Sequence, residues 1–169
     1  MIQKKICMLG TFAVGKTSLV SRFVKSVFSD KYHSTIGVKV DKKQVAVGDG
    51  QLDLLLWDIY GEDEFQKLRT SYLRGSAGYV LVVDGTRRET LGQAVAFQNR
   101  AQEAVGNVPF VLMVNKVDLT EKWEVDEAAL QELEQRGWPV FKTSAKAGTG
   151  VEEAFLALSQ RLMALPPGG

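Results

Sequence analysis

Residues 10–17 read Gly-Thr-Phe-Ala-Val-Gly-Lys-Thr, and this stretch decides the fold of the chain. It fits the phosphate-loop pattern G-x-x-x-x-G-K-[ST], which is informative where a strand precedes it and a helix follows it. Both elements are predicted here, because residues 4–9 form a short apolar run and residues 19–24 place their apolar side chains on one face of a helix. The alternative is an ordinary glycine-containing turn, which the flanking elements disfavour.

A loop of this kind wraps a phosphate chain with backbone N–H groups, and the helix N-terminus adds a partial positive charge. The side chain of Lys16 is expected to reach the β- and γ-phosphates, and the hydroxyl of Thr17 to bind Mg²⁺. The residues expected around the phosphates are Ala13, Val14, Gly15, Lys16, Thr17 and Ser18.

The rest of the chain alternates predicted strands with predicted helices. Residues 38–47 and 52–57 flank a Gly-Asp-Gly turn and are typical of a hairpin, so one strand is antiparallel. Further strands are predicted at 78–84, 110–114 and 140–143, and further helices at 89–105, 126–136 and from 151 to 162, where the apolar positions are Val151, Ala154, Phe155, Leu158 and Leu162.

This alternation predicts a doubly wound α/β fold, and the phosphate-loop pattern at its first strand and helix is typical of the P-loop NTPase type. We expect a six-stranded, mostly parallel sheet with one antiparallel strand, helices on both faces and ligands at the carboxyl ends of the strands. Without repeats or linker-like stretches, the sequence predicts one domain over residues 1–165 and a flexible tail over 166–169.

Composition excludes several classes of protein. The chain has 169 residues, 45% of them hydrophobic and 24% charged, as in one soluble globular domain. The 21 Lys and Arg residues against 20 Asp and Glu residues leave a formal charge of +1, too small for a general nucleic-acid-binding surface. A single cysteine, Cys7, excludes an internal disulfide and a multi-thiolate metal site, and it indicates a reducing compartment.

Targeting signals are also missing from the sequence. No run approaches the roughly 20 apolar residues that span a bilayer, and the first residues lack the apolar stretch of a signal peptide. The last five residues, Leu-Pro-Pro-Gly-Gly, include no cysteine that could accept a lipid. We therefore expect a cytoplasmic monomer without a lipid anchor.

Residues 115–118 read Asn-Lys-Val-Asp and follow another buried strand. A carboxylate at Asp118 can accept hydrogen bonds from both N1–H and the exocyclic amino group of guanine, whereas adenine offers no such pair of donors. Each charge-assisted bond contributes about 1.5–3 kcal/mol, so losing both disfavours adenine by several orders of magnitude. The alternative is a polar loop that caps a strand. The residues expected around the base are Asn115, Lys116, Asp118, Ser144, Ala145 and Lys146, the last three supplying backbone N–H groups to the guanine oxygen.

Together these motifs resemble the Ras superfamily of small GTPases, and within it the Rab branch. The resemblance covers residues 4–162 and includes segments 34–38 and 72–75, which are similar to the Rab-type first switch and to the segment after the second switch. It implies that Thr35 binds Mg²⁺ and senses the γ-phosphate, and that Phe28 stacks on the guanine; Phe28 alone would be read as a core aromatic. The expected absence of a lipid anchor would fit a prokaryotic member.

The resemblance also assigns roles to the motif at residues 58–61, Asp-Ile-Tyr-Gly. Asp58 would hold Mg²⁺ through water, and Gly61 would donate its N–H to the γ-phosphate. Asp58 follows a predicted strand, which places it at the same edge as the phosphate loop; the alternative is a helix cap. The implied metal ligands are Thr17, Thr35 and Asp58, and the implied catalytic residues are Lys16, Thr35, Gly61 and Glu62.

Glu62 and Phe12 depart from the family pattern. The family places a glutamine directly after the second-switch glycine to orient the attacking water, but here that residue is Glu62. A carboxylate about 4 Å from the γ-phosphate is repelled by about 4 kcal/mol for each pair of like charges at a dielectric near 20. Phe12 stands where the family often has a small residue, and its ring would obstruct an arginine from a helper protein. We expect slow intrinsic hydrolysis; the alternative is that these side chains merely pack the switch.

The sequence therefore predicts a GTP/GDP switch that contacts an effector protein through its switch regions and is served by an exchange factor and a GTPase-activating partner. Trp57 and Tyr72 resemble two of three aromatic residues with which Rab proteins contact effectors, but the third position is Val40; core packing is the other interpretation of Trp57. A guanine-nucleotide-binding interaction module without hydrolysis is the main competing hypothesis, and a P-loop kinase or ATPase is a third.

Overall fold

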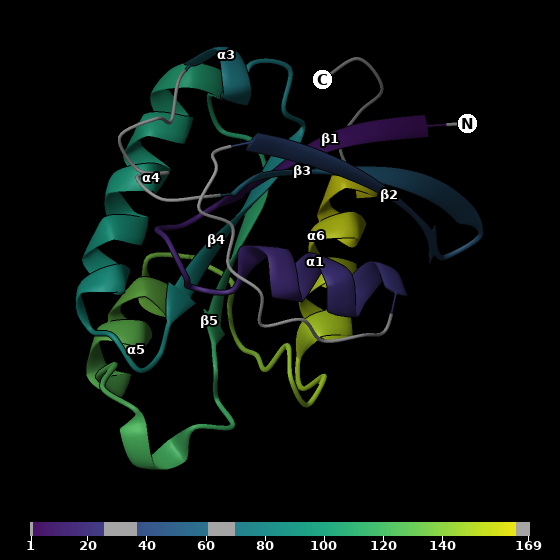
Figure 1. Cartoon of the computed structure of the whole chain (residues 1–169). Coiled ribbons are helices and arrows are strands. Elements are labelled where there is room, and N and C mark those ends of the chain that lie inside the picture. Colours follow the sequence, from purple (N-terminus) through teal and green to yellow (C-terminus); the bar gives the residue numbers. More distant parts are fainter. Residues whose placement is uncertain (1, 26–36, 61–69, 165–169) are drawn as a thin grey trace.

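The computed structural model describes residues 2–25, 37–60 and 70–164, and its core is a six-stranded sheet (Figure 1). The strands are β1 (Ile2–Leu9), β2 (Gly37–Val47), β3 (Gly50–Tyr60), β4 (Gly78–Asp84), β5 (Phe110–Asn115) and β6 (Val140–Lys142). They lie in the order β2-β3-β1-β4-β5-β6, and only the β2–β3 pair is antiparallel. The predicted mixed sheet is confirmed.

Helices cover both faces of the sheet. They are α1 (Lys16–Lys25), α3 (Thr70–Leu73), α4 (Glu89–Val105), α5 (Glu127–Gln135) and α6 (Val151–Ala164), with a 3-10 turn at Thr120–Lys122. Helices α1 and α6 pack on one face, and α3, α4 and α5 pack on the other (Figure 1). The predicted doubly wound architecture is thereby confirmed.

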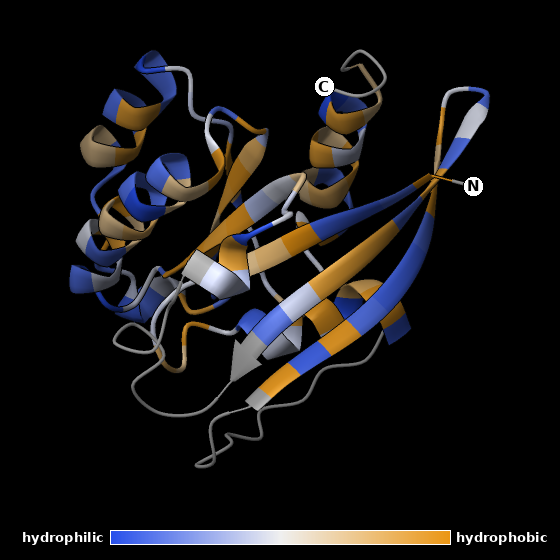
Figure 2. Ribbon diagram, turned by 90° about the horizontal axis from the view of Figure 1, so that it is seen from above, coloured by the Kyte–Doolittle hydropathy of each residue, from blue (hydrophilic) through white to orange (hydrophobic). Residues whose placement is uncertain are grey.

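Two apolar cores lie on the two faces because neighbouring residues of a strand point in opposite directions. In β1, Ile6 and Met8 join the core under α1 and α6, whereas Cys7 and Leu9 join the core under α4 and α5. Every residue of β4 is buried, as expected for a central parallel strand. Strand β2, at the edge of the sheet, instead carries polar residues along much of its length and alternates apolar and polar residues from Val38 to Asp41 (Figure 2).

The sequence predicted most element ends to within a few residues. The predicted helix at 126–136 is one residue too long at each end, because Asp126 is the N-cap and accepts a hydrogen bond from the backbone N–H of Ala128 at 3.0 Å. Strand β3 runs three residues past its predicted end at Trp57, and the prediction missed α3 and the 3-10 turn.

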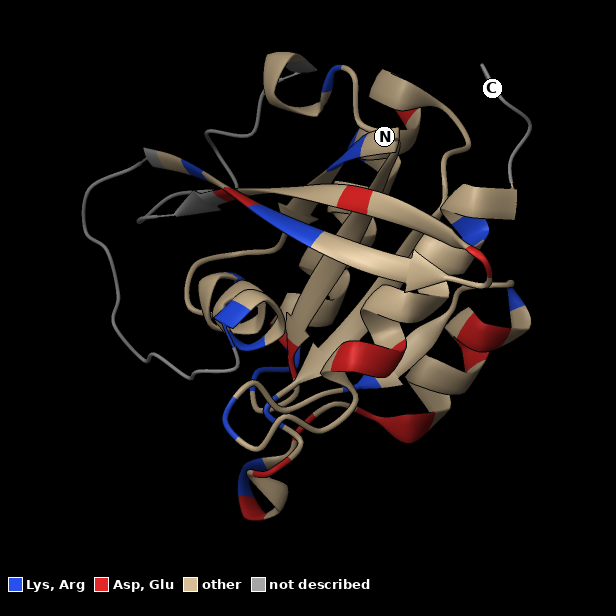
Figure 3. Cartoon of the chain, turned by 90° about the vertical axis from the view of Figure 1, so that its right-hand side faces the viewer, with Lys and Arg blue, Asp and Glu red and all other residues tan. Residues whose placement is uncertain are grey.

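Cys7 of β1 is a core residue. Its side chain is fully buried, its Sγ lies 3.0 Å from Ser76 Oγ, and burial raises the pKa of the thiol. Along the described part of the chain, Lys and Arg positions are interspersed with Asp and Glu positions (Figure 3). No described helix is long and apolar enough to span a bilayer.

Candidate functional site

The loop between β1 and α1 has a backbone that residues with side chains rarely adopt. Ala13 and Gly15 have φ angles of 67° and 106°, in the left-handed region. A Cβ on Gly15 would lie 2.3 Å from Asn115 Nδ2, and a Cβ on Gly10 would lie 2.8 Å from the carbonyl oxygen of Val82. Both glycines are therefore required by close approach, as a phosphate-binding loop needs.

Lys16 opens α1 and folds its side chain back along this loop. Its Nζ donates to the carbonyl oxygen of Gly10 at 3.1 Å, and only 5% of the residue is exposed. In the first turn of the helix, the backbone N–H of Leu19 donates to the carbonyl oxygen of Gly15 at 2.9 Å. The ammonium group is thus positioned at the mouth of the loop by the loop itself.

The carboxylate of Asp58 lies against the start of α1. Asp58 pairs with Met8 in the β1–β3 register, two residues before the loop begins, and its Oδ2 accepts a hydrogen bond from Thr17 Oγ1 at 2.6 Å. The residue is 1% exposed, and its Oδ1 is buried without a hydrogen-bond partner. Burial raises the pKa of Asp58, against the lowering effects of the Lys16 charge and the Thr17 hydrogen bond.

The Thr17 hydroxyl and the Asp58 carboxylate fit Mg²⁺, which prefers hard oxygen ligands in octahedral geometry and keeps several waters. A cation or one of its waters would also give the unpartnered Oδ1 of Asp58 a partner. No cluster of three or more His, Cys, Asp or Glu residues occurs within residues 2–25, 37–60 and 70–164. A metal ion held by Thr17 and Asp58 would therefore need further ligands from outside the described residues.

The predicted base-binding segments meet at Asn115, the last residue of β5. Its Nδ2 donates to the carbonyl oxygen of Val14 at 3.1 Å, and its Oδ1 accepts from Thr143 Oγ1 and from the backbone N–H of Ala145, both at 3.2 Å. One buried side chain thus connects the phosphate loop to the 144–147 loop.

Asp118 and Ser144 face each other across the same edge of the sheet. Ser144 Oγ donates to Asp118 Oδ1 at 2.8 Å and accepts from the N–H of Ala147 at 2.9 Å. Asp118 is exposed. The carboxylate is therefore oriented by a neighbour while remaining accessible, which suits a group that receives a base from solvent.

Sequence reasoning missed three further residues at this site. Arg22 of α1 donates from Nε to the carbonyl oxygen of Ala145 at 2.7 Å and from Nη2 to that of Lys146 at 2.5 Å. No local pattern marks such a contact between residues more than 120 positions apart. Arg87, just after β4, donates to the carbonyl oxygen of Phe12 in the phosphate loop, and Asp84, the last residue of β4, accepts from Arg87. The rule that ligands lie at the carboxyl ends of parallel strands could have marked Asp84.

Four predicted site residues, Phe28, Thr35, Gly61 and Glu62, lie outside the described residues. Of the surface compared with Rab effector sites, Val40 is 47% exposed, Tyr72 is buried and Trp57 is half-buried. The hydroxyl of Tyr72 donates to the carbonyl oxygen of Trp57 at 2.5 Å. Packing against the sheet therefore accounts for Tyr72 without a partner protein.

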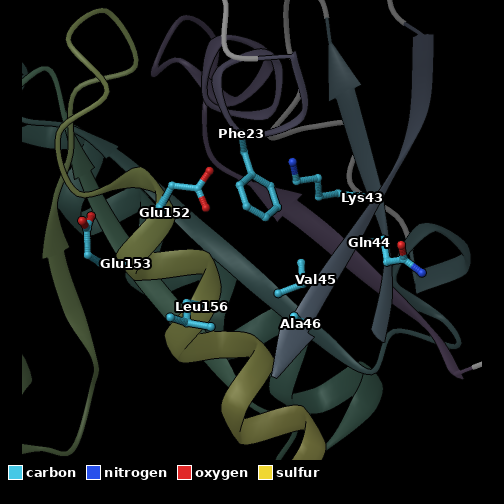
Figure 4. Close-up of a pocket in the computed structure, with 8 residues that line it drawn as sticks. All are labelled: Phe23, Lys43, Gln44, Val45, Ala46, Glu152, Glu153 and Leu156. Atoms are coloured by element: carbon cyan, nitrogen blue, oxygen red, sulfur yellow. The ribbon is translucent and has the colours of Figure 1, made fainter. Parts of the chain in front are cut away.

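A separate cavity of about 400 Å³ lies between α1, β2 and α6 (Figure 4). Phe23, Val45 and Leu156 give it apolar walls, and Lys43 and Glu152 stand at its rim. Among the residues that the structure describes, none of those predicted to bind nucleotide or metal lines this cavity. Of the residues predicted to bind the base, Asn115 and Lys116 instead donate hydrogen bonds to the loop between β1 and α1.

The sequence of this chain is similar to a known protein family and to individual known proteins. A family model described as the Ras family matches residues 5–164. The Ras-related protein Rab-13 of Canis lupus familiaris is 34% identical over 167 residues, covering 98% of this chain and 82% of that protein. The Ras-related protein Rab-21 of Geodia cydonium is 33% identical over 168 residues, covering 98% of this chain and 73% of that protein.

Proposed function

The chain belongs to the Ras family as a Rab-like small GTP-binding switch protein, and we propose that its own residues make it a guanine-selective switch with slow intrinsic hydrolysis. The observation that carries the proposal is the hydrogen bond from Asn115 Nδ2 to the carbonyl oxygen of Val14, 3.1 Å long. It holds the phosphate loop and the base-binding loops at one edge, as a single nucleotide requires.

Phosphates would be bound by the backbone N–H groups of residues 13–18 and by the ammonium group of Lys16. The left-handed conformations of Ala13 and Gly15 support this role, since alternating backbone conformations of this kind turn successive N–H groups inward. The N-terminus of α1 adds its partial positive charge.

Guanine selectivity would come from Asp118, with Lys116 and the backbone of residues 144–146 alongside. The Asp118 carboxylate is exposed and already oriented by Ser144. Because adenine would leave the carboxylate facing an acceptor instead of donors, ATP should compete poorly with GTP. The P-loop kinase or ATPase hypothesis predicts the reverse.

Thr17 and Asp58, with Thr35 from outside the described residues, would hold Mg²⁺, which when bound neutralises charge on the phosphates. Hydrolysis breaks the bond between the γ-phosphorus and the β–γ bridging oxygen as water attacks, giving GDP and phosphate. Lys16 would donate to the β- and γ-phosphates, and Gly61 would donate its N–H to the γ-phosphate. Glu62 would repel that phosphate, so hydrolysis without a partner is expected to be slow.

The competing hypothesis is a guanine-nucleotide-binding module that does not hydrolyse GTP. It is favoured by the carboxylate at position 62 and by the bulky, half-exposed Phe12 in the phosphate loop. Under either hypothesis the γ-phosphate would control an effector surface, with an exchange factor to release GDP. An activating partner would be needed only where GTP is hydrolysed.

The test has two stages on the purified protein. Competition of GTP, GDP and ATP for a fluorescent guanosine diphosphate should show selectivity for guanosine of several orders of magnitude; equal competition by ATP would exclude the proposal. Single-turnover phosphate release from GTP-loaded protein then separates the two hypotheses. Slow release that Glu62→Gln accelerates supports the switch, whereas no release from either protein leaves only the binding module.

A further inference from the structure

A buried carboxylate at the end of β4 holds two cations. Asp84 Oδ2 accepts from Lys116 Nζ at 2.8 Å and from Arg87 Nε at 2.9 Å, while Oδ1 accepts from the backbone N–H and the hydroxyl of Thr86 at 2.8 and 2.6 Å. Asp84 is 1% exposed. Every oxygen of this carboxylate therefore has a partner.

Each of the two cations makes a second hydrogen bond, to the crest of the phosphate loop. Lys116 Nζ donates to the carbonyl oxygen of Ala13 at 3.1 Å, and Arg87 Nη2 donates to that of Phe12 at 2.8 Å. One carboxylate thus fixes two consecutive loop carbonyls through two different side chains.

The crest is the part of the loop that needs such support. Ala13 has a φ angle of 67°, and a residue with a Cβ in this conformation costs about 1–2 kcal/mol relative to a right-handed one. Because the C=O and N–H of one planar trans peptide unit point in opposite directions, a contact that fixes the carbonyl of Phe12 also fixes the direction of the N–H of Ala13. Contacts that fix the carbonyls therefore preorganise the N–H groups that would bind phosphate.

We propose that Arg87, held by Asp84, is a positioning residue that maintains the crest of the phosphate loop for the β-phosphate of the nucleotide. This inference rests on the proposed nucleotide-binding function. In this role Arg87 acts through its hydrogen bond to the carbonyl oxygen of Phe12 and not through contact with the nucleotide.

The shape of the Arg87 side chain and the charge of Asp84 both keep the contact with Phe12 in place. Its planar guanidinium donates from Nε to Asp84 and from Nη2 to Phe12 at the same time, which a fixed fork of donors allows. Burial alone would raise the pKa of Asp84, but the hydrogen bonds from Lys116, Thr86 and Arg87 outweigh burial and keep the pKa below its ordinary value. The carboxylate therefore stays charged and keeps both cations in place.

The backbone around Arg87 does not depend on its guanidinium. The N–H of Arg87 bonds to the carbonyl oxygen of Asp84 at 2.9 Å, and Thr90 Oγ1 closes the turn by donating to the carbonyl oxygen of Arg87 at 2.7 Å. Arg87→Met should therefore keep the turn and the aliphatic stem while removing the contact with Phe12. Arg88→Met is the matched control, because it removes the same charge from the exposed neighbouring residue.

The experiment measures the release of fluorescent GDP and the affinity for unlabelled GMP by competition. We expect Arg87→Met to release GDP about tenfold faster than the control, as for loss of one charge-assisted hydrogen bond. The affinity for GMP, which lacks the β-phosphate, should be unchanged. This selectivity for the β-phosphate is what a general loss of structure would not produce.

Equal GDP release from Arg87→Met and Arg88→Met would overturn the inference, as would an equal loss of GDP and GMP affinity. If Arg87→Met does not fold, Arg87→Gln decides on the same two readouts: faster GDP release with unchanged GMP affinity supports the role, and GDP release as in the control overturns it. Failure of the proposed function would be seen separately, because the unmodified protein would then bind no guanosine nucleotide.

Discussion

Gly15→Ala tests whether the close approach of the phosphate loop to Asn115 is needed for nucleotide binding. The added Cβ would lie 2.3 Å from Asn115 Nδ2, closer than real Cβ contacts, at a residue whose φ angle is 106°. The clash can be relieved only if the Asn115 amide moves away or the loop shifts. In the first case the hydrogen bond from Asn115 to Val14 is lost, and in the second the N–H groups of the loop are displaced.

The expected loss of GDP affinity follows from the hydrogen bond between Asn115 and Val14. Loss of the Asn115–Val14 hydrogen bond removes about 0.5–1.5 kcal/mol, and leaving the buried Val14 carbonyl without a partner raises the cost to about 1–3 kcal/mol. At about 1.4 kcal/mol for each factor of ten, GDP affinity should fall about 5- to 150-fold. The strained φ angle adds about 1–2 kcal/mol of lost folding stability, which does not by itself change affinity.

The assay is equilibrium titration with GDP alongside thermal unfolding without nucleotide. Gly137→Ala is the matched control, since Gly137 follows α5 with a φ angle of 94° and nothing lies within 4 Å of its Cβ position. Both variants should lose stability through the left-handed backbone, and Gly15→Ala should lose more because of its clash with Asn115, but only Gly15→Ala should lose affinity. Unchanged GDP affinity in Gly15→Ala, or an equal loss in Gly137→Ala, would refute the reasoning.

Four further predictions concern the other described site residues. Asp118→Asn should weaken GDP binding about 100-fold or more and improve competition by xanthosine diphosphate, whose C2 oxygen can accept from the new amide; unaltered base selectivity would contradict the role of Asp118. Thr17→Ala should raise the Mg²⁺ concentration needed for tight GDP binding about tenfold. When a chelator removes Mg²⁺, Thr17→Ala and the wild type should release GDP at the same rate. Arg22→Met should speed GDP release several-fold relative to Lys25→Met, because only Arg22 holds the Ala145 and Lys146 carbonyls; equal rates would argue against this contact. The pKa of Asp84 is lowered in the folded protein, so its carboxylate contributes to folding stability at pH values above the ordinary pKa of 3.8. This contribution is lost as the pH falls below 3.8 and through the pKa of the folded state. The free energies of unfolding in urea of the wild type and Asp84→Asn should therefore converge in acid.

Local patterns explain how much of the fold could be predicted. The apolar run of β4 reports burial on both faces, and the spacing of apolar residues in α6 reports one buried stripe. The loop at residues 10–17 was recognisable because its glycines, lysine and threonine each have a defined task in a short stretch. Short elements such as α3, four residues long, carry too few side chains to show a period.

Contacts between distant parts of the chain could not be predicted in the same way. Arg22 and Arg87 are unremarkable cations in the sequence, and they acquire a role only where strand order brings their elements next to other loops. Because β1, β4, β5 and β6 are successive parallel neighbours, their carboxyl ends form one row, and a long side chain from one loop reaches the backbone of the next. Which cation does so depends on the fold as a whole.

The single antiparallel strand also matters for the proposed switch. Strand β3 runs parallel to β1, so its carboxyl end at Tyr60 lies at the edge where the phosphate loop begins. Strand β2 runs the other way, and its first residue, Gly37, pairs with Tyr60. Thr35 is two residues before Gly37 and Gly61 directly follows Tyr60, so both residues proposed to sense the γ-phosphate are attached to the described chain at one point. A parallel β2 would have put the attachment of Thr35 at the opposite edge of the sheet, about 30 Å away for an eleven-residue strand.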